Sequence, residues 1–397
     1  MNRIIYVVVE SPSGYSTFLE GERILIKLEN VTKQFGGAKA VDQVNLHIAP
    51  GEFLVLIGPS GCGKTTTMKM INRLIDPTAG RILIEGKDIS TENPIQLRRQ
   101  IGYVIQEIGL FPHMTIADNV ALVPRLLKWP KEKIKRRVEE LLEMVGLDAA
   151  TIMHKYPRQL SGRQRQRVGV ARALAVDPPI MLMDEPFGAL DPITREQMQD
   201  EFIKLQEQVK KTIVFVTHDM DEALKFADRV AIMDHGKIIQ CDKPEVILRR
   251  PANKFVRDFV GADHTLKQLS LIKVKDAMIT EIDTLQPQST IAQARTIFAK
   301  GYSSIVVVDE AGHAVGYVNK EDAAECPEDS PVSEIMVAPI STVDDEKTLK
   351  EALTIMVRND AGYIGVTDNN KVLVGIITSS RLQQIVGEPH LDAGGVA

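Results

Sequence analysis

The segment GPSGCGKTT, residues 58–66, is the strongest indication of the fold in this sequence. It matches the pattern G-x-x-x-x-G-K-[ST] and lies between the apolar run FLVLI (53–57) and the helix-like segment TTTMKMINRLI (65–75). In a strand–loop–helix context this pattern binds phosphate, because backbone N–H groups at a helix N-terminus neutralise negative charge and glycines allow close approach. We expect the nucleotide-binding loop to consist of Gly58, Pro59, Ser60, Gly61, Cys62, Gly63, Lys64, Thr65 and Thr66.

The segments around this loop predict an α/β fold. Residues 24–48 alternate apolar and polar, which indicates antiparallel strands, and residues 107–176 are mainly helical in pattern. PIMLMDEP (179–186) and TIVFVTHD (212–219) are further apolar runs, each ending in polar residues. Strands that alternate with helices predict a mostly parallel sheet covered by helices.

Five polar residues, two in the loop and three after the apolar runs, are candidates for phosphate chemistry. Lys64 is expected to reach the β- and γ-phosphates and Thr65 to ligate Mg²⁺. Asp184, at a predicted strand end, can hold the water shell of Mg²⁺, and Glu185 can polarise the attacking water. His218 follows another strand and can contact the γ-phosphate. Without the phosphate loop, two acids after a strand are more often part of a solvated turn, and a lone histidine is usually structural. The presence of the loop favours a functional role for all three residues.

Six motifs in order make residues 25–261 similar to the ATP-binding-cassette (ABC) ATPases, a P-loop NTPase family. In this sequence they are Walker A (58–66), the Q-loop Gln106, the signature LSGRQ (160–164), Walker B (180–186), the D-loop residue Asp191 and the switch residue His218. The resemblance implies an antiparallel β subdomain, a helical subdomain, ATP as ligand, adenine stacking on Phe35, and Mg²⁺ held through Thr65, Gln106 and Asp184.

The resemblance also implies a partner, because cassettes of this family dimerise head to tail. The signature residues Ser161, Gly162, Arg163 and Gln164 would then face ATP bound to a second ATPase subunit, in a homodimer. The family reads L-S-G-G-Q, and here Arg163 replaces the second glycine. If that position needs a positive φ, the substitution costs about 1–2 kcal/mol; alternatively, its guanidinium approaches a phosphate. On the first alternative, Arg163→Gly raises turnover or dimerisation.

The C-terminal part contains an internal repeat. IVVVDEAGHAVGYVNKEDA (305–323) aligns with IGVTDNNKVLVGIITSSRL (364–382) at an offset of 59 residues, and each follows a helix-like segment. The tandem β-α-β-β-α unit resembles a CBS-domain pair. We divide the chain into an unassigned extension 1–23, an ATPase domain 24–262 with a helical subdomain at about 107–176, a linker 263–273, repeats 274–325 and 330–388, and a tail 389–397.

The resemblance to CBS domains suggests regulatory candidates. Adenosine-binding members carry a Thr and an Asp three residues apart, and here the positions hold Asn319 and Asp322 in one copy and Thr378 and Arg381 in the other. Because each copy has half of the pair, ordinary adenosine nucleotide binding is in question. A phosphate-bearing ligand such as a cyclic dinucleotide, recognised by Arg381, and a purely structural dimerisation module are the alternatives.

Charge and composition exclude several classes of protein. From Val274 onward the chain has 9 Lys+Arg and 19 Asp+Glu, a net charge of −10, whereas the preceding part has a net charge of +5. An acidic C-terminal domain is a poor nucleic-acid or anionic-lipid binder. No apolar run approaches the roughly 20 residues of a membrane span. The cysteines Cys62, Cys241 and Cys326 are far apart in the sequence and are expected to be reduced thiols.

The amino-acid sequences of three segments resemble those of the importer branch for quaternary ammonium osmoprotectants such as glycine betaine, carnitine and choline. The segments are residues 61–89, 104–124 and 183–195. The resemblance implies an ATPase that is peripheral on the cytoplasmic face of the cell membrane. Its partners would be transmembrane permease subunits and, through them, an extracytoplasmic substrate-binding protein. The alternatives are a soluble cassette ATPase acting on ribosomes or DNA, a nucleotide sensor, and an importer for another solute.

Overall fold

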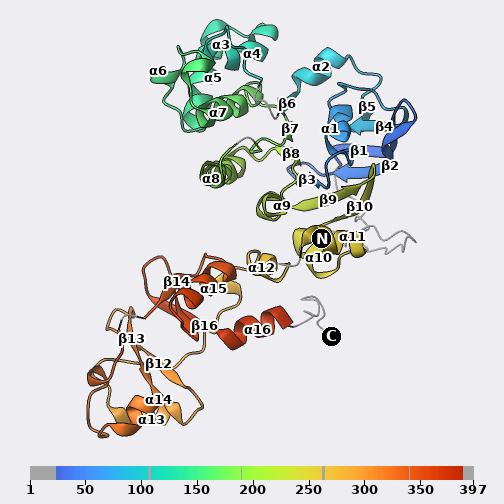
Figure 1. Cartoon of the computed structure of the whole chain (residues 1–397). Helices are drawn as coiled ribbons and strands as arrows, with labels where there is room; N and C mark the ends of the chain where they lie inside the picture. The colour runs from blue at the N-terminus through green and yellow to red at the C-terminus, as the bar shows by residue number, and fades with distance from the viewer. Residues whose placement is uncertain (1–23, 106–108, 189, 262–263, 339, 388–397) are drawn as a thin grey trace, which may run out of the picture. The chain divides into compact units, whose positions relative to one another are not determined.

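The structure is a computed structural model that describes residues 24–105, 109–188, 190–261, 264–338 and 340–387. It separates into two units, with the boundary between Val260 and Gly261 (Figure 1). Each unit has its own sheets and its own buried core.

A six-stranded sheet forms the centre of unit 1, in the order β10-β9-β3-β8-β7-β6. Its strands are β3 (Phe53–Ile57), β6 (Ile101–Val104), β7 (Ile180–Asp184), β8 (Thr212–Val216), β9 (Arg229–Asp234) and β10 (Lys237–Asp242). All pairs are parallel except β9 with β10. Every residue of β3, β7 and β8 is buried, which explains their continuous apolar sequences. The predicted mostly parallel sheet is confirmed.

A second, antiparallel sheet lies beside it in the order β2-β1-β4-β5. Its strands are β1 (Ile26–Phe35), β2 (Ala38–Ile48), β4 (Ala79–Ile84) and β5 (Lys87–Asp88). The alternation in the sequence has a direct cause, since Ile26 and Leu28 are buried while Lys27 between them is exposed. One apolar cluster joins both sheets and includes Leu54 of β3 and Met68.

The remaining elements of unit 1 are helical. They are α1 (Lys64–Ile71), α2 (Pro94–Arg99), α3 (Ile116–Val120), α4 (Leu122–Leu126), α5 (Lys131–Met144), α6 (Ala149–Ile152), η1 (Pro157–Gln159), α7 (Gly162–Ala173), α8 (Pro192–Val209), α9 (Met220–Phe226), α10 (Pro244–Arg249) and α11 (Lys254–Val260). Helix α1 packs on β7 and β8, and α9 packs on β3. None of the helices in the described ranges has both the length and the apolarity that a membrane crossing requires.

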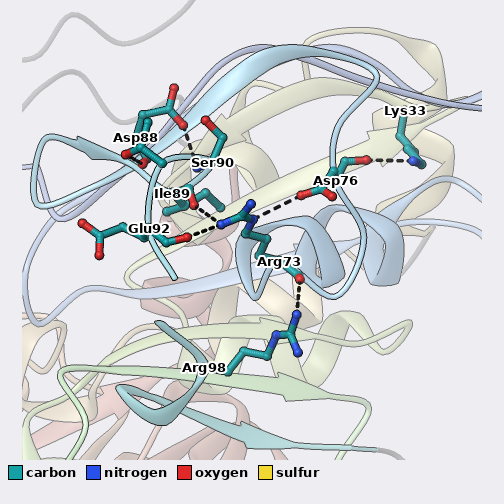
Figure 2. A network of polar contacts seen from close by, with 9 residues as sticks. Lys33, Arg73, Asp76, Asp88, Ile89, Ser90, Glu92 and Arg98 are labelled. Carbon is teal, nitrogen blue, oxygen red and sulfur yellow. Dashed lines mark hydrogen bonds and ion pairs between the residues drawn. The ribbon is translucent and has the colours of Figure 1, made fainter. Parts of the chain in front are cut away.

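A polar network holds the end of α1 against its surroundings, as Figure 2 shows. Arg73 follows α1 with a left-handed φ of 48°. Its Nη1 donates to the Ile89 carbonyl at 2.8 Å, and its Nε donates to Asp76 Oδ1 at 3.2 Å. Arg98 of α2 donates to the Arg73 carbonyl at 3.0 Å, and Lys33 of β1 donates to the Asp76 carbonyl at 2.7 Å. The helix that follows the phosphate loop is therefore tied to both β1 and α2.

Unit 2 contains two copies of one β-α-β-β-α motif, as the sequence repeat predicts. The first copy has β11 (Thr284–Leu285), α13 (Ile291–Phe298), β12 (Ser304–Val308), β13 (Ala314–Asn319) and α14 (Lys320–Glu325). The second has β14 (Thr342–Asp344), α15 (Leu349–Arg358), β15 (Tyr363–Thr367), β16 (Leu373–Thr378) and α16 (Ser379–Gly387). Single 3-10 turns, η2 (Val274–Asp276) and η3 (Val332–Glu334), precede the two copies.

The two repeats exchange contacts at two glycines. A Cβ on Gly375 of the second copy would lie 2.9 Å from the Sδ of Met278 and 2.8 Å from the Ile279 carbonyl oxygen, both in the first repeat before β11. A Cβ on Gly316 of the first copy would lie 2.7 Å from the Sδ of Met336, in the second repeat before β14. The segment at the start of each repeat thus packs on the other repeat's sheet, and only glycine leaves the room.

The expected linker 263–273 has secondary structure and buried contacts of its own. It contains α12 (His264–Leu269), and Leu269 is 2% exposed in the apolar cluster of the second repeat. Val274, also in that cluster, is fully buried. The chain therefore enters unit 2 through its second repeat before it forms the first one.

Candidate ATP site

The phosphate loop of unit 1 connects β3 to α1. Gly58 and Gly63 have φ values of 153° and 108°. A Cβ on Gly58 would lie 2.2 Å from the Met233 carbonyl oxygen, and one on Gly63 would lie 2.5 Å from the Ala40 carbonyl oxygen. Both contacts are with backbone that cannot move aside, so the loop lies closely against β2 and β9. Glycine is required at both positions.

Lys64 and Thr65 lie at the start of α1 with their polar atoms turned to the loop and to β7. Lys64, only 6% exposed, donates from Nζ to the carbonyl oxygens of Gly58 at 2.7 Å and Pro59 at 3.0 Å. The Thr65 hydroxyl donates to Asp184 Oδ1 at 3.0 Å. The fold thereby brings Thr65 and Asp184, the two expected Mg²⁺ ligands that lie 119 positions apart in sequence, into contact.

The Thr65–Asp184 pair fits a magnesium ion. Burial raises the pKa of Asp184, because its ionised carboxylate is poorly solvated there. A cation beside it would stabilise the ionised form. A hydroxyl and a carboxylate are oxygen ligands of the kind that Mg²⁺ prefers, with phosphate oxygens completing the shell. No group of three or more His, Cys, Asp or Glu residues that could hold a metal by itself occurs among the described residues. Gln106, the third expected ligand, lies outside them.

Glu185 and His218 meet at the ends of adjacent strands. His218 Nδ1 lies 3.3 Å from Glu185 Oε2. Glu185 follows β7 with a φ of 42°, and its N–H donates to the Val216 carbonyl at the end of β8 at 2.9 Å. A left-handed conformation at a non-glycine residue is strained, and such strain is common at functional sites. The structure thus brings the two expected catalytic residues together.

A buried network behind His218 was not predicted from the sequence. Thr217 Oγ1 donates to Glu222 Oε2 at 2.6 Å, and Gln199 Nε2 of α8 donates to Glu222 Oε1 at 3.0 Å. All three residues are at most 8% exposed. Burial raises the pKa of Glu222, although both hydrogen bonds oppose the shift. Glu222 lies in the first turn of α9, where an acid is expected to be solvated, so nothing in the sequence indicates that it is buried.

Helix α7 begins at the signature residues. The Gln164 N–H donates to Ser161 Oγ at 3.2 Å, and the Ser161 N–H donates to Gln164 Oε1 at 3.0 Å. This capping box leaves the positive end of the helix dipole beside Ser161.

Arg163 is in the first turn of α7 and is not among the residues with positive φ. Of the two alternatives considered for Arg163, the strained backbone is therefore not what the structure has, because a helical position accepts any L-residue other than proline without this penalty. The guanidinium Nη2 donates to Gln197 Oε1 of α8 instead.

The signature residues share a cavity of about 770 Å³ with the D-loop. Ser161, Gly162, Arg163, Gln164 and Asp191 all line it. Asp191 caps α8 by accepting from the Thr194 N–H at 3.0 Å, and these backbone bonds lower its pKa. No residue of the loop 58–66 lines this cavity. The expected site residues of one chain thus fall into two groups, one around Lys64 and one around Ser161.

Phe35, the expected adenine contact, ends β1 with 52% of its surface exposed. Lys33 Nζ lies 5.2 Å from the centre of its ring. An aromatic ring this exposed is available for stacking.

Two of the four regulatory candidates of unit 2 line a cavity, and the other two do not. Asn319 and Thr378 line a cavity of about 930 Å³, whereas Asp322 and Arg381 do not. Asp322 accepts from Asn319 Nδ2 at 3.0 Å, and Arg381 Nε donates to the Ala277 carbonyl at 3.1 Å. The geometry therefore does not support the expectation that Arg381 holds a phosphate in this cavity.

Strand β7 ends at Asp184 beside the phosphate loop of Lys64, and Ser161 of the signature caps α7. These two features define an ATP-binding cassette ATPase. Residues 41–188 match the ABC transporter family, and residues 274–328 and 332–388 match the CBS domain. The ATP-binding cassette MJ0796, in a dimeric post-hydrolysis state bound to ADP and Pi, aligns with a TM-score of 0.50 and 38% identity over 55% of this chain and 99% of that one. CbiO1 of Clostridium perfringens aligns with a TM-score of 0.54 and 28% identity over 58% and 93%.

Full-length relatives narrow the assignment. The choline transport ATP-binding protein OpuBA of Bacillus subtilis is 48% identical over 91% of this chain and 96% of its own length. The osmoprotectant import ATP-binding protein OsmV of Salmonella typhimurium is 51% identical over 75% of this chain and 80% of its own. The chain belongs to the ABC transporter family, as an ATP-binding subunit of the osmoprotectant importer branch with a tandem CBS pair. It is an ATPase, and the expected fold class is confirmed.

Proposed function

We propose that this chain hydrolyses ATP to drive the uptake of a quaternary ammonium osmoprotectant of the glycine betaine, carnitine or choline type. The observation that carries the proposal is the alignment with a choline transport ATP-binding protein through both units, over 96% of that protein's length. The glycine betaine/carnitine/choline transport ATP-binding protein OpuCA of Bacillus subtilis aligns equally well, with 48% identity over 91% of this chain. A cassette acting on ribosomes has no such support.

The site geometry supports specific roles in hydrolysis. Lys64 would exchange its two loop carbonyl contacts for β- and γ-phosphate oxygens, which are stronger acceptors. Thr65, Asp184 and Gln106 would hold Mg²⁺, which would neutralise charge on the phosphates. Glu185 would orient and polarise the attacking water, and His218, 3.3 Å from it, would hold that carboxylate and contact the γ-phosphate.

The second group of residues supports a site shared between two chains. Ser161 and the first N–H groups of α7 form an anion-binding helix end, and Asp191 lines the same cavity. Because no residue of the phosphate loop lines it, we propose that this end faces ATP held by a second copy. The solved relative MJ0796 is dimeric.

The chain would act at the cytoplasmic face of the membrane as a peripheral subunit. We propose that it binds permease subunits and that the solute reaches the permease from an extracytoplasmic binding protein, never contacting the cassette. The CBS pair would be a regulatory module, in which a bound small molecule changes the rate of ATP hydrolysis.

The test is to purify the chain with its copurifying permease in lipid and to screen solutes for stimulation of ATPase activity. We expect stimulation by glycine betaine, carnitine or choline, and none in the matched Glu185→Gln complex. Stimulation by ribosomes, or only by an unrelated solute such as a polyamine, would refute the proposal.

A further inference from the structure

Two side-chain pairs join the signature helix α7 to α8. Arg163 Nη2 donates to Gln197 Oε1, and Arg167 Nη2 donates to both carboxylate oxygens of Glu201. The two arginines are four residues apart on α7 and their partners are four residues apart on α8, so the pairs lie about one helical turn apart on both helices. Two contacts at different heights fix the orientation of α7 on α8 as well as the distance between them.

Two further hydrogen bonds tie α7 to other parts of unit 1. Arg167 Nη1 donates to the Gly146 carbonyl oxygen, just beyond the end of α5, at 2.8 Å. One guanidinium thereby connects three helices, and 15% of its side chain is exposed. Gln166, which is 3% exposed, donates from Nε2 to the Pro186 carbonyl oxygen. Helix α7 is therefore held to the residue that follows Glu185 as well as to α8.

Apolar packing does not complete the contact between α7 and α8. Val170 of α7 and Phe202 and Leu205 of α8 line a cavity of about 430 Å³, beside Arg167 and Glu201. Helices that pack closely leave few voids larger than a water molecule between them. The polar pairs therefore contribute a larger share of the positioning of α7 on α8 than they would in a filled interface.

Both arginines also line the cavity that the signature shares with the D-loop. They lie there with Ser161 and Asp191. Ser161 is the N-cap residue of α7, and Asp191 is the N-cap residue of α8. The pairs of Arg163 and Arg167 thus join the two helices whose first residues form the walls of this cavity. A shift of α7 on α8 would change the distance between Ser161 and Asp191.

We propose that Arg163 and Arg167 are positioning residues of the ATP site shared between two chains. They hold Ser161 and Asp191 at the spacing at which both face ATP bound to a second copy, because a displacement of about 1 Å is enough to impair such a site. The inference rests on the proposed function of that site. The family pattern has glycine in place of Arg163, so the contact with Gln197 is a feature of this chain.

The test is ATP-dependent dimerisation of the full chain carrying Glu185→Gln, measured by analytical ultracentrifugation with and without Arg163→Ala or Arg167→Ala. A dimer contains two shared sites, so the loss counts twice, and we expect each change to weaken dimerisation about 3- to 100-fold. The ATP affinity of the single chain, titrated at protein concentrations too low for dimerisation, should stay within 2-fold, because ATP then contacts the phosphate loop and not the signature. A variant that was merely less stable would not show this difference.

A double-mutant cycle separates positioning from direct contact with phosphate. If Arg163 acts through Gln197, then Gln197→Ala weakens dimerisation as Arg163→Ala does, and the double variant is within 2-fold of the weaker single variant. Arg165 provides the matched control, since it is an exposed arginine of α7 that lines neither cavity. Arg165→Ala should change dimerisation less than 2-fold. Losses that multiply in the cycle, or equal losses in Arg165→Ala and Arg163→Ala, would overturn the proposal.

Failure of this inference can be distinguished from failure of the proposed function. A Glu185→Gln chain that stays monomeric with ATP would refute the shared site and, with it, the positioning of that site. A dimer that Arg163→Ala and Arg167→Ala leave equally tight would refute only the positioning role.

Discussion

The hydroxyl of Thr217 is expected to stabilise unit 1 and to position His218. Thr217→Val keeps the branched shape at the end of β8 and removes only the hydroxyl. The change leaves the buried Glu222 carboxylate with Gln199 as its hydrogen-bond donor and takes an acceptor from the Asp219 N–H, 3.0 Å away. A hydrogen bond to a charged group contributes about 1.5–3 kcal/mol. Asp219 is only half-buried, so the loss of its N–H acceptor is expected to cost little. We therefore expect a loss of about 2–3 kcal/mol in the free energy of unfolding.

For a unit of this size, such a loss lowers Tm by roughly 4–12 °C. Trp129 is the only tryptophan of the chain and lies in unit 1, so its fluorescence during urea denaturation reports this unit without interference from unit 2. Thr217→Ser is the matched control: it keeps the hydroxyl, loses one buried methyl group, and should cost about 1 kcal/mol. The kcat for ATP should fall in the valine variant and recover in the serine variant.

The effect should also depend on pH. Glu222 has a folded pKa above its ordinary value of 4.5. A carboxyl of this kind contributes most stability below pH 4.5, and that contribution is lost as the pH rises through the folded pKa. The Thr217 hydrogen bond favours the ionised form, so its removal should destabilise more at pH 8 than at pH 5. Equal stabilities of wild type and Thr217→Val at pH 8, or equal losses in the serine and valine variants, would refute this reasoning.

Three further changes test the nucleotide site. Lys64→Ala removes a charged donor and should weaken ATP binding about 10- to 150-fold in a binding titration, so retained affinity would contradict the loop assignment. Glu185→Gln should bind ATP, accumulate as a closed dimer in size-exclusion chromatography, and hydrolyse about 10²- to 10⁴-fold more slowly; near-normal hydrolysis would overturn its role as base. Arg163→Gly relieves no strain and loses the bond to Gln197. It should lower the free energy of unfolding by about 1–2 kcal/mol without raising turnover, and a faster enzyme would contradict this account.

The elements that the sequence predicted share a local cause. Strands β3, β7 and β8 are buried on both faces, so their apolar character is continuous and visible in any short window. The glycines of residues 58–66 are needed for close backbone approach, and this need is encoded within nine residues. Arg163 shows the limit of a local interpretation, because a glycine in a motif does not show whether its φ is positive or helical.

The α/β class, the phosphate loop, the signature helix and the duplication in unit 2 could be predicted from the chain alone, since each depends on the order and period of neighbouring residues. Other features became known only from the folded chain: Thr65 meets Asp184, Gln199 and Thr217 converge on a buried Glu222, and Met278 and Met336 each pack on the other repeat. Tyr317 and Tyr363, from different repeats, also line one cavity. Burial and pairing depend on which distant segments the fold brings into contact, and residue order does not contain those distances.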